Sequence, residues 1–261
     1  MAESGLSVGY PDLQAECGWY LGYGRTHATW TAAQLAEVLG IVNSGVRRVY
    51  YPPAVNAQTV GYEWSFLRPS TTLAITVEGG YDYDLPDDFG RLIGVFHYAA
   101  AEYRNPISII SVSHLLNLRA SSSLTGSPTV AAIRYKASTG AAGQKQEVLF
   151  FATPDASKTL SYEYEAYNGA LSDSFPYPLG GMQLAELYIE SCLAIAETRI
   201  NDEIGQHAQQ FQALLVDAIA RDRKRGAQTY GHMGNKEEET EFFRRGYTGE
   251  VYPITYGGET I

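Results

Sequence analysis

The sequence lacks the residue patterns on which most enzymes and metalloproteins depend. Its five histidines have neither HExxH nor HxH spacing, and its two cysteines form no CxxC pair. It contains no GxxxxGK[ST] loop, no GxGxxG after a predicted strand, and no GxSxG nucleophile motif. We therefore predict no catalytic residues, no cofactor and no metal site.

Basic residues and long apolar runs are also scarce. The chain has 19 Lys and Arg residues against 29 Asp and Glu residues, which gives a formal net charge of −10. This charge disfavours a general nucleic-acid binder. It is compatible with an acidic channel wall that repels DNA, so that DNA passes without binding. No stretch reaches 18 apolar residues, and no basic flank precedes an apolar run at the start. We expect no membrane span, no secretion signal and synthesis in a cytoplasm, with Cys17 and Cys192 as buried reduced thiols.

Tyrosine is abundant, with 20 copies against three tryptophans. A tyrosine combines a large apolar ring with a polar tip, so it suits surfaces that are wet in a lone subunit and buried in an assembly. The alternative is that a β-rich protein simply uses tyrosine on its strands. Both interpretations stay open from composition alone.

Helical patterns occur toward both ends of the chain. Residues 31–34 have capping-box spacing, and the apolar residues after them predict a helix over 32–44, which Gly45 either ends or interrupts. Residues 184–202 predict a helix that is apolar around much of its circumference, so we expect it to be buried on more than one side. Its apolar surface is wider than one neighbouring helix covers, and the excess could serve subunit contacts. Residues 204–223 carry one apolar stripe and end in a basic run.

Between these helices the hydrophobic period changes to two, which indicates strands. Residues 85–94 look like a helical turn or corner, and residues 110–121 like a short helix. A turn at 153–155 separates two strands, and on the second strand four residues share one face: Leu160, Tyr162, Tyr164 and Ala166. The predicted strands are 64–67, 71–77, 95–99, 128–137, 146–152 and 159–167.

These patterns predict an α+β fold: a helical bundle formed by the N- and C-terminal helices, an inserted antiparallel β-sandwich or barrel module, and an extended C-terminal tail. The expected divisions are 1–60 for the N-terminal helices, 61–178 for the β-rich module, 179–226 for the C-terminal helices and 227–261 for the tail. The chain ends should meet, because the apolar C-terminal helices need the N-terminal ones to cover them.

The tail combines charge with aromatic residues that have no period, which favours a segment disordered in the monomer that folds on a partner. Its expected partner-binding anchors are Phe242, Phe243, Tyr247, Tyr252 and Tyr256. The alternative is a loop that packs back on its own domain.

One acidic cluster needs weighing: Asp82, Asp84, Asp87 and Asp88. Such carboxylates could bind calcium or perform glycosidase acid–base chemistry, but the spacing matches no EF-hand loop. Asp beside Pro or in a turn is also what local capping predicts, and this is the favoured interpretation. On one predicted strand Glu163 and Glu165 alternate with apolar residues, which is typical of a solvated or subunit-facing edge.

The order of the segments resembles tailed-bacteriophage head-to-tail connector (adaptor) proteins of the tail tubular protein A-like kind. The similarity covers about residues 12–225 and consists of segment order and composition rather than one diagnostic motif. The segments that carry it are SGVRRVYYPP (44–53), YEWSFLRP (62–69), YDLPDDFGRLIG (83–94), ATPDASKTLSYEYEAY (152–167) and PYPLGGMQLAELYIESCLAIAE (176–197).

This resemblance implies a non-enzymatic structural virion protein at the neck, the head-to-tail junction. Such adaptors form a homo-oligomeric ring, typically of twelve subunits, between the portal protein and a downstream tail or stopper protein. Double-stranded DNA passes through the channel during packaging and ejection without sequence-specific binding. A neighbouring stopper or nozzle protein is one alternative. The others are a phage carbohydrate-active enzyme using Asp87, Asp88 or Glu163, and a sugar-binding module using Trp19, Trp30 and Trp64, although these indoles are expected to serve the core.

Overall fold

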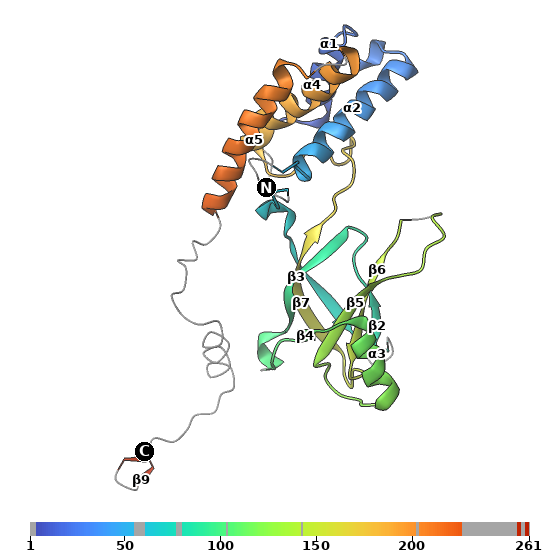
Figure 1. Ribbon diagram of the computed structural model, residues 1–261, viewed down its shortest axis with the longest axis vertical. Helices are drawn as coiled ribbons and strands as arrows, with labels where there is room; N and C mark the ends of the chain where they lie inside the picture. The colour runs from blue at the N-terminus through green and yellow to red at the C-terminus, as the bar shows by residue number, and fades with distance from the viewer. Residues whose placement is uncertain are drawn as a thin grey trace.

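In the computed structural model, four long helices gather at one end of the molecule and two β-sheets at the other (Figure 1). The structure describes residues 4–54, 61–76, 80–102, 104–141, 143–201, 204–225, 255–256 and 259–260. These residues form five α-helices and two sheets of three and four strands, and neither sheet closes into a barrel. The predicted α+β class is confirmed.

The helix cluster combines both parts of the chain that were expected to be helical. Its members are α1 (Tyr10–Tyr20), α2 (Ala32–Tyr50), α4 (Ala185–Asn201) and α5 (Gln206–Arg225). Helix α4 packs against α1, α2 and α5, and Leu187, Tyr188 and Cys192 are buried there. Ile189 and Ile195 are only partly buried and Ile200 is 51% exposed, so α4 keeps some uncovered apolar surface.

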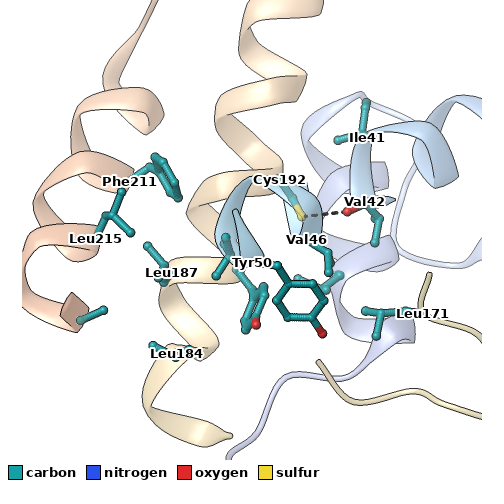
Figure 2. Packing of buried hydrophobic residues seen from close by; sticks show 14 of the residues in the cluster. Ile41, Val42, Val46, Tyr50, Leu171, Leu184, Leu187, Cys192, Phe211 and Leu215 are labelled. Atoms are coloured by element: carbon teal, nitrogen blue, oxygen red, sulfur yellow. Dashed lines mark hydrogen bonds between the residues drawn. The ribbon is translucent and has the colours of Figure 1, made fainter. Parts of the chain in front are cut away.

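The apolar side chains between these helices form one continuous core. Figure 2 shows Val42 and Tyr50 of α2 close to Cys192 of α4, with Phe211 of α5 on the other side of α4. Cys17 of α1 and Cys192 are both free and buried, as predicted. Contact with the Cys17 thiol, together with burial, raises the pKa of Cys192 well above its ordinary value.

Helix α2 begins as predicted but continues further. The Thr31 hydroxyl accepts a bond from the Gln34 amide N–H at 3.3 Å, and the Gln34 side-chain oxygen accepts one from the Thr31 N–H at 2.8 Å. The helix runs through Gly45 to Tyr50. A Cβ on Gly45 would meet Sγ of Cys192 and also its Cα at 3.0 Å. Gly45 therefore lets α2 and α4 approach closely, and it does not end α2.

The strands form two sheets, with the orders β1-β7-β3 and β2-β6-β5-β4. All pairings are antiparallel except the short parallel β4–β5 contact. A separate antiparallel pair joins β8 to β9. The strands are β1 (Ser70–Ile75), β2 (Asp82–Asp84), β3 (Phe89–Tyr98), β4 (Ser108–Ile109), β5 (Val130–Tyr135), β6 (Gln146–Phe151), β7 (Lys158–Ala166), β8 (Thr255–Tyr256) and β9 (Glu259–Thr260).

The two sheets share a second apolar core. Phe96 of β3 lies with its ring centroid 4.9 Å from that of Tyr162 on β7 and 5.7 Å from that of Phe150 on β6. Because Phe150 belongs to the other sheet, this core contains side chains from both sheets. The predicted inward face of β7 is confirmed, since Leu160, Tyr162, Tyr164 and Ala166 are all buried. The strands on either side of the turn at 153–155, β6 and β7, lie in different sheets rather than in one hairpin.

The expected short helix over 110–121 is α3 (Val112–Ser121), which packs outside the second sheet through Leu115. Short 3-10 helices fill some connections: η1 (His27–Thr29), η2 (Ser65–Leu67), η3 (Ala100–Glu102) and η4 (Met182–Leu184).

Two predicted elements are wrong. Residues 64–67 were expected to be a strand, but η2 occupies Ser65–Leu67 and buries Trp64 and Leu67 in the helix core. The expected corner at 85–94 is shorter, because β3 already begins at Phe89. Register shifts between Phe89 and Arg91 and between Ile93 and His97 interrupt the alternation of β3, so its strand pattern is obscured in the sequence.

Candidate functional site

The aspartates of the acidic cluster do not converge on one point. Asp82, Asp84 and Asp87 each pair with a different cation, and Asp88 accepts a bond from a tyrosine hydroxyl. The partners are Arg119 at 2.8 Å from Asp82, Lys136 at 2.7 Å from Asp84, Lys145 at 2.7 Å from Asp87, and the Tyr164 hydroxyl at 3.1 Å from Asp88. Within the described ranges, no group of three or more His, Cys, Asp or Glu side chains is arranged to hold a metal. The bonds of this cluster join strands and loops of the sheet pair, and through Arg119 also helix α3.

The three tryptophans have different environments. Trp64 is buried, and its indole N–H donates to the Val49 carbonyl at 2.7 Å. The indole of Trp30 donates to the Tyr23 carbonyl at 3.1 Å. Trp19, in contrast, is 62% exposed on α1, so the expectation that it serves the core is wrong.

The helix cluster and the sheet pair are linked by two chain segments, which we call the junction (Figure 1). Its described residues are 51–54 and 61–69 in the first segment and 167–181 in the second. Aromatic side chains hold the two segments together. The Tyr51 ring lies edge-on to Tyr167 with centroids 5.6 Å apart, and its hydroxyl donates to the Ala166 carbonyl at 3.3 Å. Burial, with smaller effects of Glu165 and Tyr167, raises the pKa of Tyr51 to about 12.

The second junction segment is fixed to the helices through one backbone position. The Leu179 N–H donates to the Tyr50 hydroxyl at 3.0 Å, and the Tyr188 hydroxyl donates to the Leu179 carbonyl at 2.7 Å. Because Tyr50 lies on α2 and Tyr188 on α4, this segment is held by helices from both parts of the chain. The rings of Tyr50 and Tyr188 also meet edge-on.

The first junction segment is held by a buried carboxylate on α5. Asp222 accepts bonds from the Ser65 N–H at 3.0 Å, the Ser65 hydroxyl at 2.5 Å and the Tyr62 hydroxyl at 2.9 Å. Burial and this carboxylate raise the pKa of Tyr62 to about 12. Sequence analysis missed Asp222, because it is one acid within a basic run at the predicted helix end.

A cavity of about 250 Å³ opens at the junction. One wall comes from the last turns of α2 and the other from the chain just after β7. The lining residues are Asn43, Val46, Arg47, Tyr50, Tyr51, Asn168, Gly169 and Ala170.

A tight turn follows this cavity in the chain. Ser172 and Phe175 exchange backbone hydrogen bonds of 3.2 and 3.0 Å. Phe175 at the turn is 75% exposed, and Tyr177, Leu179 and Met182 after it are also exposed. This apolar, partly aromatic surface suits protein contact better than chemistry.

Four of the five predicted tail anchors lie outside the described residues: Phe242, Phe243, Tyr247 and Tyr252. The fifth, Tyr256, lies in β8, paired with Glu259 of β9.

A family model described as SU10 adaptor protein matches residues 9–234. The chain belongs to the SU10 adaptor protein family. The match spans the helix cluster, the sheet pair and the junction, so the resemblance to phage head-to-tail adaptors is confirmed. Membership of this family implies a structural component of a phage virion with a non-enzymatic role.

No curated protein matches the chain. Of the helices in the described ranges, none has the length and apolar character needed to cross a bilayer.

Proposed function

We propose that this SU10 adaptor forms a ring beneath the portal, at the neck of the virion, and joins the capsid to the tail. The family match over residues 9–234 is the observation that carries the proposal. The ring contains about twelve copies, as the resemblance implies, with the portal protein on one side and a tail or stopper protein on the other. Double-stranded DNA passes through it without sequence-specific binding. The formal net charge of −10 suits such a passage, because an acidic wall does not retain DNA.

We also propose that the chain is divided as its pattern predicts. Residues 1–60 and 179–226 form a helical bundle, residues 61–178 form an inserted β-sandwich module, and residues 227–261 form a partner-binding tail. Two separate apolar cores, one among the helices and one among the strands, support a division into two units. Trp64, Leu67 and Leu171, from the ends of the 61–178 segment, pack in the helix core and so tie the module to the bundle.

A binding test with the portal of the same phage examines the function. Light scattering is expected to find the purified chain monomeric or weakly associated alone, and ring-shaped complexes after portal rings are added. A chain that stays monomeric and ignores portal rings would overturn the proposal. A chain that binds only a portal already carrying another adaptor would instead be the neighbouring stopper or nozzle.

The tail can be tested in the same assay. Replacing Phe242, Phe243, Tyr247, Tyr252 and Tyr256 together by Ala is expected to weaken portal or tail-protein binding while the thermal unfolding of the bundle stays unchanged. Binding that is unaffected would remove these residues as anchors and leave the ring proposal in place.

A further inference from the structure

The junction cavity has the size and the walls to receive an aromatic side chain. An apolar cavity of roughly 150 Å³ holds a benzene molecule, and this one measures about 250 Å³. Val46 and Tyr50, both nearly fully buried, provide apolar wall, and Gly169 and Ala170 on the opposite side have small or no side chains. Asn43 and Asn168 add polar wall, and the Asn168 amide nitrogen is buried without a hydrogen-bond partner among the described residues.

The cavity also carries a positive charge. Arg47 lines it and is exposed, and in the part of the chain that the structure describes no carboxylate pairs with this guanidinium. An exposed arginine beside an aromatic wall favours a group that combines a ring with a nearby anion. A phenylalanine and a carboxylate only a few residues apart on a rigid turn would meet both conditions.

The turn after the cavity presents this combination. Phe175 is 75% exposed, so it does not fill the cavity of its own chain. Asp173, two residues earlier, is exposed and pairs with no cation among the described residues. The backbone bonds between Ser172 and Phe175 fix the turn before any partner arrives, which lowers the entropy lost on binding.

We propose that Phe175 of one copy enters the junction cavity of a second copy, where its Asp173 pairs with Arg47. The contact rests on the proposed function, because a ring needs each subunit to touch the next. A projecting turn on one subunit meets a cavity on the other; repeated head to tail, this contact closes into a ring if the rotation between subunits allows it, whereas two reciprocal contacts would close into a pair. The same pairing gives both shape and charge complementarity.

Charge reversal tests the pairing directly. Arg47→Glu and Asp173→Arg each place like charges at every contact, so each variant alone is expected to lose at least about tenfold in assembly on portal rings. A mixture of the two variants is expected to assemble again. In an alternating ring, the reversed cavity of one variant meets the reversed turn of the other, and the remaining contacts are wild type. The readout is the number of adaptor copies per portal, from particle mass.

Phe175→Asp tests the apolar part of the contact and is expected to weaken assembly by roughly thirtyfold, as for a central hot-spot residue. Matched controls are Leu124→Asp, which also changes an exposed apolar residue, and Glu186→Arg and Lys224→Glu, which also reverse exposed charges. These controls are expected to assemble like wild type. Circular dichroism of each variant checks that the fold is retained, as expected for exposed sites.

The outcomes separate this contact from the ring itself. If wild type assembles and the charge variants assemble equally well, the contact is refuted and the proposed function stands. If the charge variants lose assembly and mixing the two variants does not restore it, the contact is also refuted, and Arg47 is assigned to another partner such as the portal. If the mixed variants assemble into closed pairs rather than rings, the contact is supported and the proposed ring is overturned. A wild-type chain that never assembles overturns both.

Discussion

The close approach of α2 and α4 makes Gly45→Ala an informative substitution. A Cβ at this position would meet Sγ of Cys192 and lie 3.0 Å from its Cα and backbone N. Cys192 is 1% exposed, so its side chain has no free space into which to rotate. The contact involves backbone, and the two helices must therefore move apart to admit one methyl group.

Opposing effects set the size of the change. Alanine gains about 1 kcal/mol over glycine in a helix interior. Overpacking a core costs about 1–3 kcal/mol, and separating the helices also weakens the 2.9 Å bond from the Ser191 hydroxyl to the Gly45 carbonyl, worth about 1 kcal/mol. The variant should be less stable than wild type by about 1–3 kcal/mol.

Gly40→Ala provides the matched control in the same helix. There a Cβ would meet only the Nη1 of Arg199, at 3.4 Å, and a long side chain can move aside. This variant should gain up to about 1 kcal/mol from helix propensity. Denaturant unfolding followed by helical circular dichroism measures both. Cys192→Ala in the Gly45→Ala background should recover part of the loss. A Gly45→Ala chain as stable as Gly40→Ala would refute the packing explanation.

Three further perturbations test other parts of the fold by the same unfolding measurement. Asp222→Ala leaves the Ser65 N–H without its acceptor and should cost about 2–4 kcal/mol. As a control at an exposed position, Asp217→Ala should change the free energy of unfolding by no more than about 0.5 kcal/mol. Equal losses in the two variants would contradict the role given to Asp222. Arg119→Lys should lower the free energy of unfolding by about 2 kcal/mol, because a lysine ammonium cannot reproduce the guanidinium bonds to two backbone carbonyls and one carboxylate. An unchanged unfolding midpoint would argue against this role of Arg119. Burial raises the pKa of Tyr162 from 10.0 to about 12, so its protonated form stabilises the fold, and this contribution should be complete below about pH 10 and lost as pH rises through 12. Tyr162→Phe should flatten this alkaline decline, and a decline of unchanged slope would exclude Tyr162 as a source.

The helices were predictable wherever the deciding residues are close in sequence. The Thr31 and Gln34 spacing identified the start of α2, and both expected capping bonds are present. The end of α2 was not predictable, because a glycine that ends a helix and one that packs against another helix look the same locally. The role of Gly45 follows from its close contact with Cys192, which lies on a different helix.

Short apolar windows in the middle of the chain were harder to assign. Trp64 and Leu67 are three residues apart, which suits a helical turn, yet four residues also fit a strand. The deciding contact is the bond from the Ser65 N–H to Asp222, across 157 positions. The inward face of β7 was predictable, since eight residues of unbroken polar and apolar alternation, 159–166, leave only one register that buries the tyrosines.

The candidate site was predictable only in kind. The resemblance to phage adaptors implied contact surfaces rather than chemistry, whereas the abundant tyrosine left two interpretations open, and several tyrosines, including Tyr162 and Tyr188, are buried in the chain's own cores. The sequence does not indicate that Trp19 and Phe175 are exposed, because their exposure depends on what the rest of the chain covers. Arg47 and Asp173 carry no motif at all, and only the fold places one at a cavity and the other on a turn.

The packing of α4 bears on where the proposed self-association would be located. An all-round apolar helix suggests that neighbouring subunits bury the excess, but α1, α2 and α5 already cover much of α4 within one chain and leave Ile200 exposed. The sheet pair likewise has its own core, in which Phe96, Phe150 and Tyr162 are buried. The proposed subunit contacts would therefore use side chains that neither core buries. Several of these, including Phe175 and Tyr51, lie at the junction, so a ring contact there would also fix the sheet pair relative to the helix cluster.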